Sequence, residues 1–139
     1  MSLIVDASVA VKWFVEEEGS EAAQRILDEP AAVLLAPDLL LVEVGNALWK
    51  KFNRDEVSWA QMLAAVSTLR VVFQPPNLVP VAELAEHATR LAVELGHPIY
   101  DCLYLALTAR TRGGVLVTDD RKLLAMASRL GVPARGLTP

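Results

Sequence analysis

The chain has 139 residues, a formal net charge of −4, 53% hydrophobic residues and one cysteine. This composition excludes a disordered chain and a disulfide-stabilised domain, and it argues against an extended nucleic-acid-binding surface, because clustered Lys and Arg normally neutralise phosphates. No apolar run reaches the roughly 20 residues that cross a bilayer, and no basic leader precedes the first strand pattern, so we expect a cytoplasmic protein without membrane contact.

The first segment predicts the strand around which the chain is organised. Leu3, Ile4 and Val5 form a continuous apolar run that stops at Asp6 and small residues. Such a run is typical of a buried parallel strand. It delivers the carboxylate to the carboxyl end of the sheet, where open α/β sheets bind their ligands.

Residues 8–69 predict four helical segments and one further strand. In chain order these are a short apolar helical segment over Ser8–Phe14, a helix from Ser20 to about Asp28, a strand over Ala32–Ala36, a helix from Asp38 to about Phe52 and a helix from Ser58 to about Leu69. The long helix has a predicted core stripe at Leu41, Val44, Leu48 and Phe52. Glu43 falls off this stripe, on a face shared with Asn46.

Residues 71–135 continue the alternation. The expected elements are a short strand over Val71–Phe73, a turn at Pro75–Asn77, a helix from Val79 or Pro80 to about Leu95 closed by Gly96, a helix from Ile99 to about Thr111, a strand over Val115–Val117, a helix over Arg121–Leu130 and an edge strand within Val132–Arg135. The helix that begins at Ile99 is apolar on nearly every face, so we expect it to be central and buried, with Asp101 as the exception. Short strands alternating with helices predict one α/β domain, residues 1–139, with a parallel sheet of four to five strands covered on both faces.

Acidic residues follow two of these strands and interrupt two of the helices. Asp6 ends the first strand, and Asp119 and Asp120 follow the strand at Val115–Val117. If the two strands are neighbours, their acids meet in one crevice, which Asp101 and Glu43 can also enter. Carboxylates this close repel one another unless a cation binds between them, and oxygen-only ligands favour Mg²⁺ or Mn²⁺ over Zn²⁺.

Each acid also has a purely structural interpretation. Asp6 can cap the helix that begins near Ser8, and Asp119 or Asp120 can cap the last helix. Asp101 can lie in a first helical turn because the helix dipole favours negative charge there. Glu43 taken alone is typical of a solvated helix residue.

Four segments, in order and at suitable spacing, resemble motifs of the PIN-domain family, and within it the VapC-type toxins of prokaryotic toxin–antitoxin pairs. They are Ile4–Val9, Leu41–Leu48, Ile99–Ala106 and Val117–Leu123. The resemblance covers essentially the whole chain. It implies a three-layer α/β/α sandwich and a Mg²⁺- or Mn²⁺-dependent endoribonuclease. It also implies a homodimer that a small VapB-like antitoxin inhibits.

The resemblance also implies roles for individual residues. Asp6, Glu43 and Asp101 match the metal-site positions, and the fourth acid is Asp120 or Asp119, of which we favour Asp120. The hydroxyls of Ser8 and Thr118 fit as groups that orient the metal ligands. Asn46 fits the same supporting role, or that of a core amide satisfied by backbone.

Cations and tryptophans supply candidates for RNA contact. Lys12, Lys50, Lys51 and Arg54 are expected near the crevice mouth, where they touch RNA phosphates or form an ordinary solvated surface. The tryptophans at 13, 49 and 59 either stack on bases or pack in the core or a dimer contact.

Two other functions compete with the nuclease. One is a phosphotransfer or phosphatase domain with Asp6 as nucleophile, but the sequence lacks the second Asp two residues later that this chemistry favours. The other is a non-catalytic PIN-like scaffold that only binds a partner, which the presence of all four acids disfavours.

Overall fold

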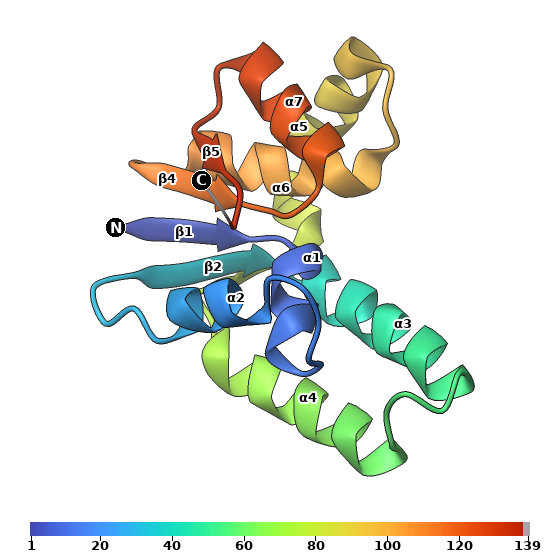
Figure 1. The fold of residues 1–139 in the computed structure, drawn as a ribbon. Helices are drawn as coiled ribbons and strands as arrows, with labels where there is room; N and C mark the ends of the chain where they lie inside the picture. The colour runs from blue at the N-terminus through green and yellow to red at the C-terminus, as the bar shows by residue number, and fades with distance from the viewer. Residues whose placement is uncertain (138–139) are drawn as a thin grey trace.

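The computed structural model describes residues 1–137 and has a sheet of five parallel strands at its centre (Figure 1). The strands lie in the order β3-β2-β1-β4-β5. Their bounds are Ser2–Val5 for β1, Val33–Pro37 for β2, Leu78–Val79 for β3, Gly114–Val117 for β4 and Ala134–Arg135 for β5. The prediction of a parallel sheet, with its edge strand near the C-terminus, is confirmed.

Helices cover both faces of this sheet. They are α1 (Ala7–Ala10) with a following 3-10 turn (Val11–Trp13), α2 (Ser20–Leu27), α3 (Leu39–Asn53), α4 (Trp59–Val72), α5 (Val81–Leu95), α6 (Ile99–Arg110) and α7 (Arg121–Leu130). From β1 the chain first winds outward to β3 and then crosses back to β4. Because crossovers are right-handed, this reversal places the later helices on the opposite face. In Figure 1, α5, α6 and α7 lie toward β4 and β5, and α2 and α4 lie toward β2. The strand order with right-handed crossovers puts these two groups on opposite faces, which confirms the three-layer sandwich.

The helix α6 is central, as its apolar sequence predicts. All residues from Cys102 to Thr108 are buried, because α5 covers one side of α6 and strands β1, β2 and β4 cover the other. Asp101, in the first turn, is only partly buried. No helix within residues 1–137 combines the length and apolarity needed to cross a membrane.

The prediction of a strand at Val71–Phe73 is wrong. Helix α4 begins with a capping box at Ser58 and Gln61 and continues to Val72, and the third strand lies at Leu78–Val79 instead. Leu69 and Phe73 are both fully buried at a spacing of four, so packing of the helical face outweighs the strand preference of β-branched and aromatic residues.

The core stripe of α3 also differs from the prediction at its two ends. The buried residues are Leu40, Val44 and Leu48, whereas Leu41 is only partly buried and the Phe52 side chain is 40% exposed. In Figure 1, α3 and α4 extend past the carboxyl ends of the strands. The last turn of α3 therefore has no sheet to pack against.

Candidate active site

The central pair of strands brings two distant segments together at the carboxyl edge of the sheet. Val5 of β1 pairs with Val117 of β4, so Asp6 and Thr118 leave the sheet side by side. The chain winds outward in opposite directions from this pair, toward β2 on one side and β5 on the other. This point is a topological switch point, where open α/β sheets bind ligands. The two strands are neighbours, which is the condition under which the sequence places their acids in one crevice.

Asp6 is held by donors on both of its carboxylate oxygens. Oδ2 accepts hydrogen bonds from Ser8 Oγ at 2.8 Å and Thr118 Oγ1 at 2.7 Å, and Oδ1 accepts one from the Ala7 N–H at 2.8 Å. The last of these contacts caps helix α1, so the structural interpretation of Asp6 holds as well. The carboxylate is therefore rigidly oriented at the sheet edge. The residue is nearly buried, with 6% of its surface exposed.

The electrostatic environment of Asp6 opposes its negative charge. Burial raises the pKa of Asp6 most strongly, hydrogen bonds from Thr118 and Ser8 lower it, and the charge of Asp101 raises it again. The net result is a pKa above the ordinary aspartate value. A carboxylate in this state gains more than an exposed one from a nearby cation.

Glu43 and Tyr104 join helix α3 to the central helix α6. The Tyr104 hydroxyl donates a hydrogen bond of 2.6 Å to Glu43 Oε1. The pKa of Glu43 is raised to about 7, chiefly by burial, while the hydrogen bond from Tyr104 lowers it and the charges of Asp6 and Asp101 raise it further. The charge of Asp101 therefore acts on both Asp6 and Glu43, and the charge of Asp6 acts on Glu43.

Asp101 lies in the first turn of α6. Its Oδ2 lies 2.8 Å from Nε2 of His97, the residue four positions earlier. An ionised carboxylate only accepts hydrogen bonds, so the imidazole N–H donates when Asp101 is charged. The same geometry places an acid near a helix N-terminus, so the dipole interpretation of Asp101 is also satisfied.

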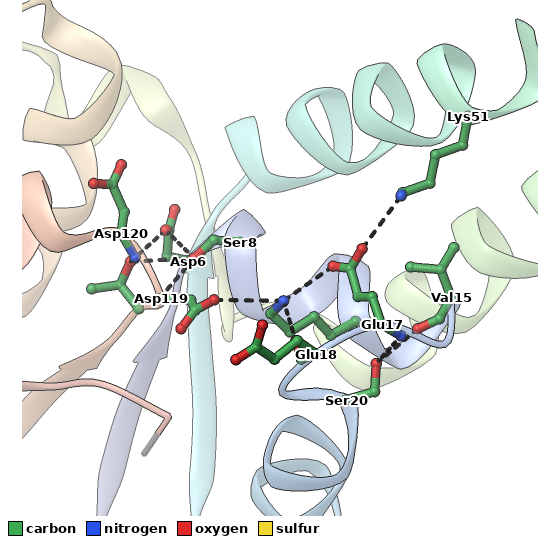
Figure 2. A network of polar contacts seen from close by, with 11 residues as sticks. Asp6, Ser8, Val15, Glu17, Glu18, Ser20, Lys51, Asp119 and Asp120 are labelled. Carbon is green, nitrogen blue, oxygen red and sulfur yellow. Dashed lines mark hydrogen bonds and ion pairs between the residues drawn. The ribbon is translucent and has the colours of Figure 1, made fainter. Parts of the chain in front are cut away.

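The turn after β4 holds the two remaining acids in different surroundings (Figure 2). Asp120 caps helix α7, with Oδ1 accepting from the N–H groups of Lys122 and Leu123. Asp119 is exposed, and its Oδ2 lies 3.5 Å from Lys12 Nζ. The hydroxyls that hold Asp6 also hold this turn. Ser8 Oγ accepts from the Asp119 N–H at 2.9 Å, and Thr118 Oγ1 accepts from the Asp120 N–H at 3.0 Å.

Most of the predicted RNA-contacting cations already have acidic partners. Lys12 and Lys51 both pair with Glu17, at 3.1 Å and 3.3 Å, and Arg54 pairs with Glu56. Burial raises the pKa of Glu17, but the hydrogen bonds and charges of the two lysines outweigh it, so the pKa is lowered. Lys12 is therefore part of a partly buried ion-pair network, and the interpretation as solvated surface is wrong for this lysine.

Two other side chains can be placed from their contacts and exposure. Trp13 is structural, because its ring stacks on Phe73 and its indole N–H donates to the Ala23 carbonyl at 2.9 Å. Asn46 is exposed on α3, so its interpretation as a core amide is wrong and its supporting role stays a prediction. The remaining tryptophans, Trp49 and Trp59, are exposed.

The acids fit a hard divalent cation by chemistry but not as a ready-made cage. Within residues 1–137, no group of three or more His, Cys, Asp or Glu side chains is arranged to hold a metal ion. Mg²⁺ usually keeps several waters and binds through only one or two carboxylates plus substrate phosphate. The oxygen donors of Asp6, Glu43 and Asp101 fit that mode of binding.

The sequence interpretation missed two polar partners of these acids. Tyr104 lies within the helix that the sequence predicts to be apolar on nearly every face, and His97 lies two residues before the start of that helix. Their signal was the spacing, because Asp101 and Tyr104 are three residues apart and share one face of α6, and His97 lies four residues before Asp101. Only the structure shows that this face meets Glu43.

Comparisons with known proteins agree with this geometry. The family model of the PIN domain matches residues 3–128. The chain is 35% identical over 133 residues to Ribonuclease VapC3 of Pyrobaculum aerophilum, covering 96% of this chain and all of the relative. It is 38% identical over 91 residues to Exonuclease VapC9 of the same organism, covering 63% of this chain and 62% of the relative.

The fold is similar to that of a solved structure as well. A chain in the structure of VapBC-1 from nontypeable Haemophilus influenzae superposes with a TM-score of 0.60 at 14% identity, over the full length of both chains. At this identity the similarity concerns the fold. Together with the match to residues 3–128 and the full-length relative, it identifies the chain as a member of the PIN-domain family, among its VapC-type proteins.

Proposed function

We propose that this protein is a divalent-metal-dependent endoribonuclease, the toxin of a toxin–antitoxin pair. The observation that supports it most is the set of three acids, Asp6, Glu43 and Asp101, whose charges act on one another at the carboxyl edge of the sheet. Among the ion pairs within residues 1–137, none joins a Lys or Arg to any of the three. Such acids are suited to an external cation.

The acids would hold a Mg²⁺ or Mn²⁺ ion, with Asp120 as the fourth acid of the site. Such an ion would supply activation of a water and stabilisation of negative charge on the phosphodiester. Ser8 and Thr118 keep Asp6 in one orientation, and His97 does the same for Asp101. Because the hydroxyls of Ser8 and Thr118 also hold the Asp119–Asp120 turn, movement of this turn and reorientation of Asp6 are linked.

The proposed partners follow from the same relatives. The relatives are a ribonuclease and an exonuclease by name, and the fold match is VapBC-1. These names support an RNA substrate and a small antitoxin. The homodimer is proposed on the resemblance alone.

The name of the second relative supports a specific alternative, an exonuclease. A circular single-stranded RNA separates the two activities, because only an endonuclease can cut a molecule without ends. We expect the purified protein to linearise the circle in the presence of Mn²⁺ or Mg²⁺, and a chelator to stop the reaction. If only linear RNA is shortened, the endonuclease proposal is wrong.

A double variant tests the assignment of the acids. Asp6→Asn combined with Asp101→Asn is expected to retain the circular dichroism spectrum of the native protein and to lose cleavage. Cleavage by the purified double variant at the native rate would contradict the assignment. Calorimetry adds a second test, because a non-catalytic scaffold would bind no Mn²⁺, and a phosphorylated Asp6 would instead support the phosphotransfer alternative.

A further inference from the structure

The hydroxyl of Tyr104 is a buried polar group with a single long-range partner. Tyr104 is 0% exposed, and its ring lies within the apolar core of α6. Phenylalanine has the same shape and would fill this position without a polar atom. The hydroxyl contacts Glu43, which is 61 residues away in the sequence, at 2.6 Å. The need for a polar atom at this position therefore comes from Glu43 and not from packing.

Charge repulsion favours rotation of the Glu43 side chain away from Asp6 and Asp101. The charges of Asp6 and Asp101 both act against its ionised form, and no Lys or Arg within the described residues pairs with it. A glutamate has three side-chain torsions, and a partly buried one on a helix surface can rotate toward water. The contact with Tyr104 opposes this rotation, because it fixes Oε1 against a side chain that cannot itself move.

The sequence position of Tyr104 connects it to the same site. Asp101 and Tyr104 are three residues apart on α6, so they lie on one face of the helix. That face contacts α3 at Glu43, and α6 also packs against β1, the strand that Asp6 follows. The central helix α6 thus supplies one acid directly and holds a second acid through a hydroxyl.

We propose that Tyr104 is a positioning residue, which holds Glu43 through Oε1 and so limits the orientations from which this carboxylate, together with Asp6 and Asp101, would bind a divalent cation. This inference rests on the proposed metal-dependent function. Preorganisation lowers the cost of ordering a ligand when the ion binds, and groups that orient metal ligands typically change metal affinity or activity by 10- to 100-fold when removed.

The test is Mn²⁺ binding measured by calorimetry on the full chain. Tyr104→Phe removes only the hydroxyl, and Tyr100→Phe is the matched control, because Tyr100 lies on the same helix and is 60% exposed. We expect Tyr104→Phe to raise the Mn²⁺ dissociation constant about 10-fold and Tyr100→Phe to leave it unchanged. Tyr104→Met, a second variant without the hydroxyl, replaces Tyr104→Phe if circular dichroism shows that the latter is unfolded.

RNA cleavage supplies a second readout. The Mn²⁺ concentration at half-maximal rate is expected to rise about 10-fold in Tyr104→Phe, while the rate at saturating Mn²⁺ stays close to that of the native protein. A merely structural role would lower the melting temperature without changing this concentration.

The outcomes separate this inference from the proposed function. If the native protein binds Mn²⁺ and Tyr104→Phe binds it equally well, the positioning role is wrong and the nuclease proposal is unaffected. If the native protein binds no Mn²⁺ and cuts no RNA, both are wrong. Weaker binding by Tyr104→Phe, with native behaviour of Tyr100→Phe, supports the inference.

Discussion

Two groups of acids at the same edge of the sheet differ in what satisfies their charge. Asp6, Glu43 and Asp101 receive hydrogen bonds from hydroxyls, a backbone N–H and an imidazole. Asp119 and Asp120, by contrast, have structural partners in a lysine and the start of a helix. The first group is oriented without being neutralised by Lys or Arg, and this is the arrangement that favours binding of an external cation.

The comparison also explains why adjacency in sequence is a poor guide to function here. Asp119 and Asp120 are neighbours in the chain, yet one side chain pairs with Lys12 and the other caps α7. Asp6, Glu43 and Asp101 are far apart in the chain, yet their charges act on one another. Burial produces this difference, because charges that are shielded from water interact more strongly than exposed ones.

The largest contrast is expected between single substitutions in the two groups. Asp101→Asn removes a proposed metal ligand and is expected to lower RNA cleavage by about 1000-fold, since a lost cation contact costs several kcal/mol of transition-state stabilisation. Asp119→Asn weakens only a pairing with Lys12 at an exposed carboxylate and should change the rate by no more than about twofold. Initial cleavage rates of the two purified variants test this contrast, and equal losses would refute it.

The pH dependence of stability should reveal the cost of ionising Glu43 in the folded protein. Its pKa is about 7 in the folded protein and 4.5 in the reference state, so the fold favours the protonated form. Below about pH 4.5, Glu43 is protonated in both the folded and the unfolded protein, so it does not reduce the free energy of unfolding. As the pH rises to about 7, the unfolded chain releases its proton first, and the free energy of unfolding falls.

In Glu43→Gln the side chain cannot titrate and keeps an oxygen that accepts from Tyr104. The free energy of unfolding of this variant should therefore not fall through titration at position 43. Between pH 4.5 and 8 we expect the variant to gain about 2 kcal/mol relative to the native protein, after a reduction for partial solvent screening. Urea unfolding at both pH values without divalent ions measures the change. A pH-independent difference would mean that Glu43 has an ordinary pKa.

Asp120 allows its two roles to be separated, because Asn caps helices about as well as Asp. Asp120→Asn is expected to keep the melting temperature and to lower cleavage by about 10-fold if this residue is the fourth acid of the site. Asp120→Ala should lose cleavage similarly and also about 1 kcal/mol of stability, because the cap is removed. Native activity in Asp120→Asn would assign this residue to the cap alone.

The smallest expected effect concerns the ion-pair network beside the site. Lys12 has a side chain that is only 9% exposed, and its Nζ contacts Glu17, Asp119 and the Glu18 carbonyl. Lys12→Met should destabilise the protein by about 1 kcal/mol, less than a fully buried pair would, because Glu17 keeps Lys51.

Lys50→Met is the matched control, since Lys50 is exposed on the neighbouring helix, and its effect should stay within about 0.5 kcal/mol. Thermal unfolding of both variants makes the comparison. A larger loss for the control would contradict the special role of the network.

The sequence by itself determined most of the elements of this protein and the order of its acids. A continuous apolar run identified β1 and placed Asp6 at its end, and the all-round apolar pattern identified α6 as the central helix. The strand predicted from the sequence at Val71–Phe73 was wrong, because these β-branched and aromatic residues lie in the last turn of α4 and just after it. Periodicity is a local property, so it can be read from neighbouring residues wherever packing agrees with it.

Only the tertiary structure decided which acids interact and how each is held. The contact between Tyr104 and Glu43 joins two helices through one hydroxyl, and no local pattern in either helix predicts it. The same holds for the raised pKa values of Asp6 and Glu43, which depend on removal from water and on charges contributed by distant segments. Desolvation and charge repulsion are set by the groups that surround an atom in space, and those groups are known only once the chain is folded.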